Sequence, residues 1–265
     1  MPADYWNIAG LCLLTGLAGF IDSIAGGGGL ISLPAYLLVG LPAHQAAGSN
    51  KFSAGIGVSL AVARFGLKGK IMWREALTGM VAALAGGGVG SLLAVYLSAT
   101  VLKFIIVGML PIVGCYLLLH GVPKDKSGRQ GGAPPVQSSR RRLVISVLIG
   151  LLIGAYDGLV GPGTGTFVII ASVMFLHIDL LSASANAKVI NFASNIASLV
   201  VFLLNGSVVF HYAIPAAAST LLGNYLGVSY CMKHGAGGIR KILFVVLSLL
   251  FAKLVYDLVV ASGVF

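Results

Sequence analysis

Charged side chains are scarce in this chain of 265 residues, making up only 9% of it. A soluble domain carries about 25% charged residues, because they keep its surface hydrated. Hydrophobic residues make up 58% of the chain, and its mean hydropathy is +1.00. The composition therefore excludes a soluble globular domain and predicts an all-α membrane protein with several spans.

Cysteine is also rare, and the motifs of common active sites are missing. Cys12, Cys115 and Cys231 lie far apart without a CxxC pair, which argues against both disulfides and a metal site. The chain has no GxxxxGK[ST] motif for nucleotides, and no GxSxG or HExxH motif. We therefore predict no metal, no cofactor and no enzymatic activity.

Basic residues exceed acidic ones, giving a formal net charge of +10. Most of the basic residues gather between apolar segments, in loops 66–74 and 120–142. This placement is typical of the positive-inside rule, so we expect both loops in the cytoplasm and no nucleic-acid partner.

Ten apolar segments separate into two sets of five. The first set covers about 5–25, 30–41, 45–65, 75–97 and 101–119, and the second covers 143–160, 164–178, 183–204, 211–231 and 240–260. The intervening stretch, HGVPKDKSGRQGGAPPVQSSRRR, has the Pro, Gly, Ser and charge content of a linker. We predict an N-terminal repeat (1–119), a basic linker (120–142) and a C-terminal repeat (143–265).

The two sets share a motif in which an aspartate and a lysine flank a glycine break. The first copy is GFIDSIAGGGGLISLPAYLLVGLPAHQAAGSNK, from Gly19 to Lys51, and the second is GAYDGLVGPGTGTFVIIASVMFLHIDLLSASANAK, from Gly154 to Lys188. Asp22 corresponds to Asp157, and Lys51 corresponds to Lys188. Such a coincidence is informative because the chain holds only seven acidic residues.

The distribution of basic loops predicts that the two repeats are inverted. The loop containing Gly69 is basic, whereas its counterpart, 205–211, has no Lys or Arg; the basic residues of the second half fall one span later. Corresponding loops then lie on opposite sides of the membrane, as in many secondary transporters. The short segment after each glycine break favours a broken or re-entrant helix. Five full spans per half, or three spans with a re-entrant pair, both satisfy the inversion.

The motif also predicts an anion site. Helices that begin after Gly29 and at Thr164 would direct their free N–H groups at the midplane, and the glycines would let the backbone approach an anion. Lys51 and Lys188 would supply positive charge. The candidate substrate-binding residues are Lys51, Lys188, Gly26, Gly27, Gly28, Gly29, Gly161, Gly163, Thr164, Asn50 and Asn191.

Asp22 and Asp157 have two possible roles, which are to hold the lysines or to carry coupling protons. In the plainer interpretation the four charges form interior salt bridges that join the repeats, or the lysines extend to the membrane surface. Similarly, the glycines would only allow close helix packing, as we expect for the run at 86–88, and the asparagines would only bond between helices.

These motifs resemble those of the TauE/SafE family of sulfite exporter-like permeases. The resemblance rests on AGGGGLISLP followed by a lysine-bearing segment, and on YDGLVGPGTGTF with NAKVINFASN. It implies an inner-membrane transporter for sulfur-containing anions such as sulfite or organosulfonates. Pro162 and Thr164 interrupt the second glycine run, so the two halves are expected to contribute unequally to the site.

The resulting hypothesis is a secondary transporter that moves a small sulfur-containing anion by alternating access around a site between the repeats. Its partners would be that anion and the lipid bilayer, with protons as the candidate coupling ions. The alternatives are a passive anion channel that uses the same site, or a membrane-embedded enzyme.

Overall fold

A computed structural model of the chain describes residues 2–102, 104–105 and 139–261. Its helices are α1 (Pro2–Ala25), α2 (Gly29–Leu38), α3 (Ala43–Leu67), α4 (Trp73–Tyr96), α6 (Ser139–Leu159), α7 (Thr164–Ala171), α8 (Leu180–Leu204) and α9 (Phe210–Ala261), and a π-helical turn, η1 (Ser172–Leu176), follows α7. The described residues contain no strand, so the all-α prediction is confirmed. Most of the predicted segment 101–119 and of the linker lies outside the described residues.

Four of the described helices are long and apolar enough to cross a membrane. They are α1 from Tyr5 onward, α4, α6 and α8. The helix α3 is as long as α8 but less apolar, because it carries several buried polar residues, including Ser49, Asn50, Lys51 and Ser53. Side chains this polar are tolerated at membrane depth when they face the bundle interior.

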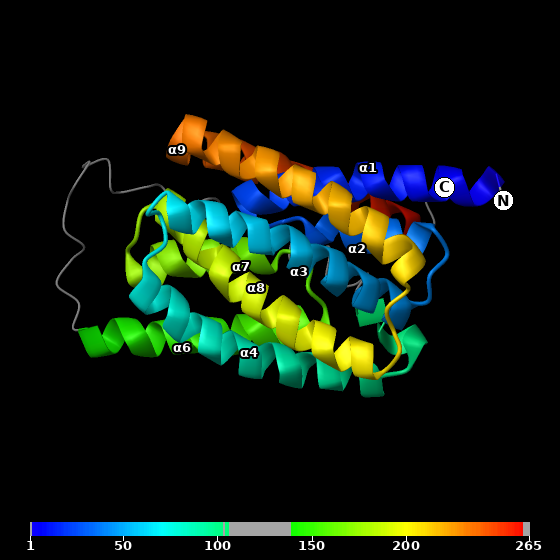
Figure 1. Cartoon of the computed structure of the whole chain (residues 1–265), viewed down its shortest axis with the longest axis horizontal. Helices are drawn as coiled ribbons and strands as arrows, with labels where there is room; N and C mark the ends of the chain where they lie inside the picture. The colour runs from blue at the N-terminus through cyan, green and yellow to red at the C-terminus, as the bar shows by residue number, and fades with distance from the viewer. Residues whose placement is uncertain (1, 103, 106–138, 262–265) are drawn as a thin grey trace.

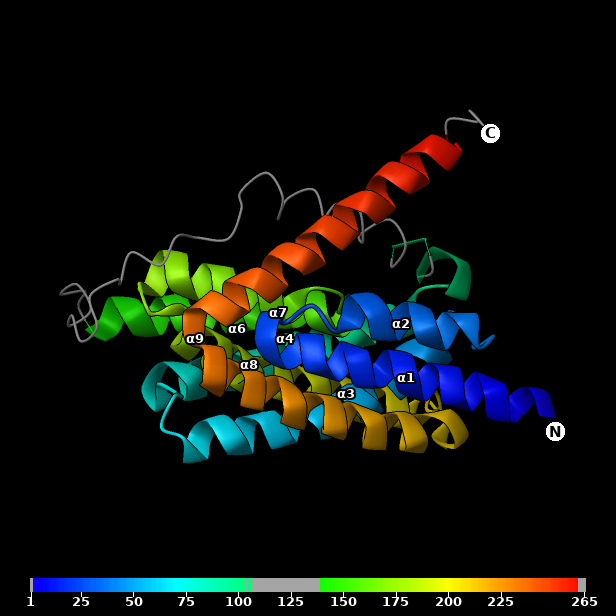
Figure 2. The same cartoon turned by 90° about the horizontal axis from the view of Figure 1, so that it is seen from above.

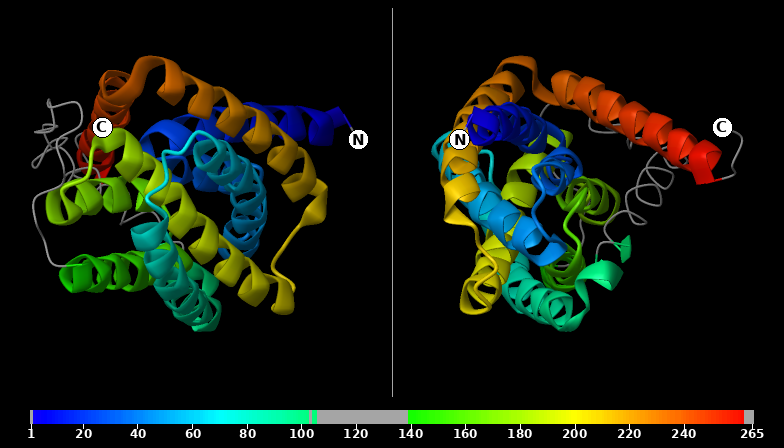
Figure 3. Two further views of the ribbon diagram at one scale, coloured as in Figure 1. Left: turned by 60° about the vertical axis from the view of Figure 1, so that its left-hand side comes forward. Right: turned by 90° about the vertical axis from the view of Figure 1, so that its right-hand side faces the viewer.

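The long helices run roughly along one axis and pack in pairs (Figures 1 and 2). One pair is α1 with the first part of α9, and another is α4 with α6, while α3 and α8 contact each other between these pairs. Figure 3 gives two further views of this arrangement. Glycines allow the close approach within the pairs: a Cβ on Gly223 would lie 2.0 Å from the Gly16 carbonyl oxygen, and one on Gly90 would lie 2.0 Å from that of Ala155.

The segments after the two glycine breaks form short helices in the bundle interior, as the sequence predicts. The first, α2, has 10 residues, and the second runs from Thr164 to Leu176 through α7 and η1. Figure 2 shows α2 turning back beside α1, and Gly28 accordingly lies against the Ala18 carbonyl. The ring of Phe167 in α7 packs on that of Tyr156 in α6, which indicates the same reversal in the second half. Each of the two short helices therefore packs beside the helix that precedes it.

The last helix consists of two parts joined at a bend. Gly235 has φ of 56° and ψ of −150°, which no α-helical residue adopts. Figures 1 and 2 show the chain reversing its course at this end of the bundle. The predicted segments 211–231 and 240–260 thus lie in separate helical parts with a glycine hinge between them. The loop 68–72 and the start of α6 lie at the same end of the bundle as this hinge.

Candidate functional site

The two glycine breaks meet at the centre of the molecule. A Cβ on Gly26 would lie 2.1 Å from the carbonyl carbon of Gly165, and Thr166 Oγ1 donates to the Ala25 carbonyl at 2.7 Å. Gly26 has φ of +75°, and Gly161 has φ of +88°. Residues other than glycine rarely adopt such positive φ angles. Glycine is therefore needed at the breaks for both conformation and space, and backbones of the two halves touch there.

Two buried ion pairs surround this meeting point, and each joins one half of the chain to the other. Lys51 Nζ lies 2.8 Å from Asp157 Oδ2, and Lys188 Nζ lies 2.8 Å from Asp22 Oδ2. Three of these four side chains are at most 5% exposed, and that of Asp22 is 14% exposed. Each lysine thus pairs with the aspartate of the other motif copy, in agreement with the plainer interpretation of these charges.

The ammonium groups of the two lysines, which belong to α3 and α8, lie at the C-terminal ends of α6 and α1, the helices that precede the breaks. Lys51 Nζ donates to the Asp157 carbonyl at 2.6 Å, and Lys188 Nζ donates to the Asp22 carbonyl. A helix C-terminus carries partial negative charge, which favours a cation. The position of each ammonium group is therefore set by a carbonyl and a carboxylate of the same aspartate.

The carboxylates lie close to where the short helices begin. Thr164 Oγ1, at the first residue of α7, donates to Asp157 Oδ1 at 2.8 Å. The Gly28 N–H, just before α2, points at Asp22 Oδ1 from 3.4 Å. A helix N-terminus favours an anion. In this structure the protein's own carboxylates occupy the positions that the sequence analysis expects for a bound anion.

A small cavity of about 40 Å³ lies between these elements. Ten of the predicted site residues and coupling residues line it: Asp22, Gly26, Gly28, Gly29, Asn50, Lys51, Asp157, Gly161, Thr164 and Asn191. Gly27, Gly163 and Lys188 are not part of the lining. The cavity brings together residues from both motif copies, and Lys51 is the lysine that reaches it.

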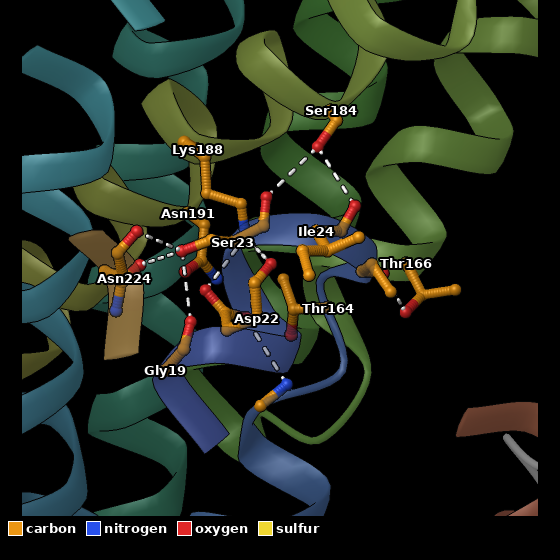
Figure 4. A network of polar contacts seen from close by, with 12 residues as sticks. Gly19, Asp22, Ser23, Ile24, Thr164, Thr166, Ser184, Lys188, Asn191 and Asn224 are labelled. Carbon is orange, nitrogen blue, oxygen red and sulfur yellow. Dashed lines mark hydrogen bonds and ion pairs between the residues drawn. The ribbon is translucent and has the colours of Figure 1, made fainter. Parts of the chain in front are cut away.

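Further polar residues complete the lining, although the sequence analysis did not select them as site residues. They are Ser32, Ser53, Asn195, Thr220 and Asn224. Asn224 accepts from Ser23 Oγ at 2.7 Å (Figure 4). Its side-chain N–H donates to the Thr220 carbonyl at 2.9 Å. An amide within the apolar segment 211–231 is the signal that would have identified Asn224, because such residues face the interior of a bundle.

The amide of Asn50 differs from the others in the cavity. The side chains of Asn191 and Asn195 hydrogen-bond to each other, at 3.0 Å, and Asn224 bonds to Ser23. Asn50 Oδ1 is buried and has no hydrogen-bond partner among the described residues. Buried polar atoms in native proteins usually have a partner. This atom therefore points to a water molecule or ligand as its natural partner.

The site has the chemistry of a binding site rather than of a metal centre. Within the described residues, no three His, Cys, Asp or Glu side chains lie close enough to hold a metal ion. The lining contributes amides, hydroxyls, glycine backbone, one ammonium group and the carboxylates of Asp22 and Asp157, and its apolar members are the small residues Ala18, Ala54 and Val58. Such a lining suits a small polar solute.

Comparison with known proteins places the chain among membrane transporters. The family described as "Sulfite exporter TauE/SafE" matches residues 11–254. A "Probable membrane transporter protein" of Haemophilus influenzae is 34% identical over 241 residues, covering 91% of each chain. "Probable membrane transporter protein ORF9" of Sinorhizobium is also 34% identical, covering 91% of this chain and 89% of its own. The YfcA protein of Escherichia coli, with the same description, is 33% identical over 246 residues, covering 91% and 87%. No solved structure matches the chain.

Proposed function

Because the chain belongs to the TauE/SafE family of membrane transporters, we propose that it is a secondary transporter for a small sulfur-containing anion. The anion binds in the central cavity between the two motif copies. Alternating access exposes this cavity to one side of the membrane at a time. The sulfur chemistry of the substrate comes from the family description, while the anion site comes from the residues described above.

The observation that carries the proposal is the position of Lys51. Its ammonium group is at the wall of a small polar cavity in the middle of a membrane protein. A lysine at the bilayer centre costs about 2.5–3.5 kcal/mol on insertion scales, so it is retained where it has a function or a partner. Lys51 has both a partner in Asp157 and access to the cavity.

The crossed ion pairs support alternating access around this site. Each pair joins one motif copy to the other, and the backbones of the two breaks touch at Gly26 and Gly165. Helix pairing repeats as well, since α1 packs on α9 and α4 packs on α6. Inverted repeats would generate both the crossed ion pairs and the repeated helix pairing. Movement of one repeat against the other then opens the site to either side of the membrane.

In this proposal the predicted residues divide into three roles. Lys51 and Lys188 supply positive charge, and Asn50 and Asn191 donate hydrogen bonds. The starts of α2 and α7 offer backbone N–H groups through Gly26 to Gly29 and through Gly161, Gly163 and Thr164. Asp22 and Asp157 hold the lysines when no anion is bound.

Flux of labelled sulfite into liposomes containing the purified protein tests the proposal. We expect saturable uptake by the wild type and at least about a tenfold loss in Lys51→Gln, because the ammonium group contacts the anion. Lys68→Gln in the exposed loop after α3 is the control and should retain full uptake. A panel containing methanesulfonate, taurine and sulfate then defines the substrate.

Substituting one member of a buried ion pair leaves the other without a partner, which costs about 3–5 kcal/mol. The double variant Lys51→Gln/Asp157→Asn avoids this problem, since it removes both charges together. We expect it to fold and to remain inactive. Full uptake by the double variant would show that the site is elsewhere, and uptake that increases without saturation would favour a channel.

A further inference from the structure

The two carboxylates of the site differ in the hydrogen bonds that they receive and in their exposure. Asp157 receives hydrogen bonds from Thr164 Oγ1 at 2.8 Å and from Ser194 Oγ at 2.6 Å, in addition to its ion pair with Lys51. Its side chain is 3% exposed. Hydrogen bonds to an ionised carboxylate favour the charged form. Asp157 thus has a complete set of partners as an anion.

Asp22 has fewer hydrogen-bond partners than Asp157, and its side chain is more exposed. Its side chain receives the ion pair of Lys188 and one long contact, 3.4 Å, from the Gly28 N–H. The positions that correspond to Thr164 and Ser194 in the first half are Gly29 and Gly57, neither of which has a side-chain hydroxyl. The Asp22 side chain is 14% exposed and lines the cavity, whereas Lys188 is fully buried. Water or a solute in the cavity therefore reaches the Asp22 carboxylate.

The other charged or titratable groups around Asp22 come from four elements packed around it. They are Lys188 from α8, Lys51 from α3 and Asp157 from α6 at the cavity, and Cys231 from α9, whose thiol contacts the Ser23 carbonyl. The helices α2 and α7 contribute none at this position. The neighbouring charges of Lys51 and Asp157 compensate each other, so the charge state near Asp22 depends on Asp22 and Lys188.

From this asymmetry we propose that Asp22 is the residue that exchanges a proton with the cavity, and that one such proton accompanies each monovalent anion. The proposal rests on the transport function above. Without substrate, two ammonium groups and two carboxylates give the site a net charge of zero. When Asp22 takes up a proton, Lys188 loses its counter-charge, and the site has a net charge of +1. Binding of a monovalent anion then restores zero, and Asp157 remains ionised throughout.

The charge balance explains why coupling is required. An uncompensated charge buried in a membrane protein is costly, so the site binds the anion and the proton together or neither of them. The proton and the anion leave together on the other side, and Asp22 pairs again with Lys188. Transport of a monovalent anion by this cycle moves no net charge.

The matched variants Asp22→Asn and Asp22→Glu test the assignment in proteoliposomes. Methanesulfonate is the probe, with sulfite as a second probe, because the charge of methanesulfonate does not change with pH. Two fluxes are compared: accumulation driven by an inward proton gradient, and exchange of labelled for unlabelled probe at equal pH. Asp179→Asn is the control, since Asp179 caps α8 and asparagine caps helices equally well.

We expect Asp22→Asn to lose proton-driven accumulation by at least about tenfold while it retains exchange, because asparagine resembles the protonated carboxyl group. Asp22→Glu retains the carboxyl group and should still respond to the proton gradient, at a reduced rate. Proton-driven accumulation by Asp22→Asn at the wild-type level would overturn the proposal, as would loss of the proton response in Asp22→Glu while exchange continues. Loss of both fluxes in a folded Asp22→Asn protein would also overturn it.

A binding measurement on the wild type keeps the proposal testable if Asp22→Asn does not fold. Methanesulfonate is added to the unbuffered protein in detergent with a pH-sensitive dye. We expect proton uptake together with binding in the wild type and in Asp22→Glu, which retains a carboxyl group. Binding without proton uptake would refute the role of Asp22 and leave the transport function intact. Absence of flux for every probe in the wild type would instead refute the transport function itself.

Discussion

At the scale of single residues, the centre of the molecule contains two kinds of polar group. The lysines and aspartates are matched in pairs, with an Nζ–Oδ2 distance of 2.8 Å in each. The amides are less uniform, because Asn224 is fully bonded within the protein and Asn50 Oδ1 has no partner among the described residues. A buried acceptor that the fold leaves without a partner costs stability, and it is available to a water molecule or a solute group that donates a hydrogen bond.

Alanine substitution of these two asparagines should separate stability from function. We expect Asn224→Ala to lower the free energy of unfolding by about 1–3 kcal/mol, because it removes the partner of Ser23. Asn50→Ala should change stability by less than this and reduce anion uptake instead. Thermal unfolding in detergent and flux in liposomes measure the two effects. The opposite order of stabilities would contradict the assignment of Asn50 to the solute.

At the scale of helices, close packing depends on glycines at particular positions, and the next residue along the helix can lie outside the contact. In the run Gly86–Gly88, a Cβ on Gly86 would lie 2.2 Å from the Leu151 carbonyl of α6, and one on Gly87 would lie 2.8 Å from Ser194 of α8. A Cβ on Gly88 would meet nothing within 4 Å. The expected packing role of this run is thus carried by two of its three glycines.

Gly86→Ala and Gly88→Ala form a matched pair that tests this packing. We expect Gly86→Ala to destabilise the protein by about 1–3 kcal/mol, because the methyl group forces α4 and α6 apart. Gly88→Ala should be neutral or slightly stabilising, since alanine is the better helix former. Melting temperatures of the purified variants in one detergent give the comparison. Equal melting temperatures would mean that α4 and α6 are not held at this distance.

At the scale of the whole molecule, the basic loops gather at one end of the bundle. The loop 68–72, the start of α6 with Arg140 to Arg142, and the hinge at Gly235 with Lys233 lie at this end, while the N-terminus lies at the other (Figures 1 and 2). Positive charge is retained on the cytoplasmic side of membrane proteins. We therefore expect this end in the cytoplasm and the loop 205–209 outside.

Cysteine labelling at two corresponding glycines tests this orientation. Gly69 and Gly206 have φ of 65° and 66°, and a Cβ at either would meet nothing within 4 Å, so both substitutions cause similar strain. With the three native cysteines replaced by alanine, Gly206→Cys should react with a membrane-impermeant maleimide in intact cells. Gly69→Cys should react only after permeabilisation. Reaction of both from outside would contradict the inverted arrangement.

Much of this architecture could be predicted because it follows from solvation. The apolar segments, the short helices after the glycine breaks and the interruption near Gly235 all follow from composition and from backbone chemistry. The four central charges could be selected for the same reason, since charges are costly at membrane depth. The inversion and the membrane orientation remain predictions.

The partners of these charges could not be predicted from the sequence. Lys51 and Asp22 belong to the same motif copy, and only the contact between the two breaks at Gly26 and Gly165 brings Asp157 to Lys51 instead. The first residues of two helices also differ from the predicted segments. The helix α4 begins at Trp73 and α6 begins at Ser139, a few residues before the apolar segments that start at 75 and 143. Asn224 was missed because it lies in a segment without a motif.

The crossed pairing also has a consequence for biosynthesis. Lys51 is made 106 residues before Asp157, and at about 5–20 residues per second the ribosome needs roughly 5–20 seconds to supply that partner. During this interval the newly inserted N-terminal half carries one carboxylate and one ammonium group without their final partners. The nascent chain must neutralise them with each other, or hold them at the membrane surface, until the second half arrives. Completion of the protein is then an exchange of partners, in which two charges of one half separate and each joins the other half.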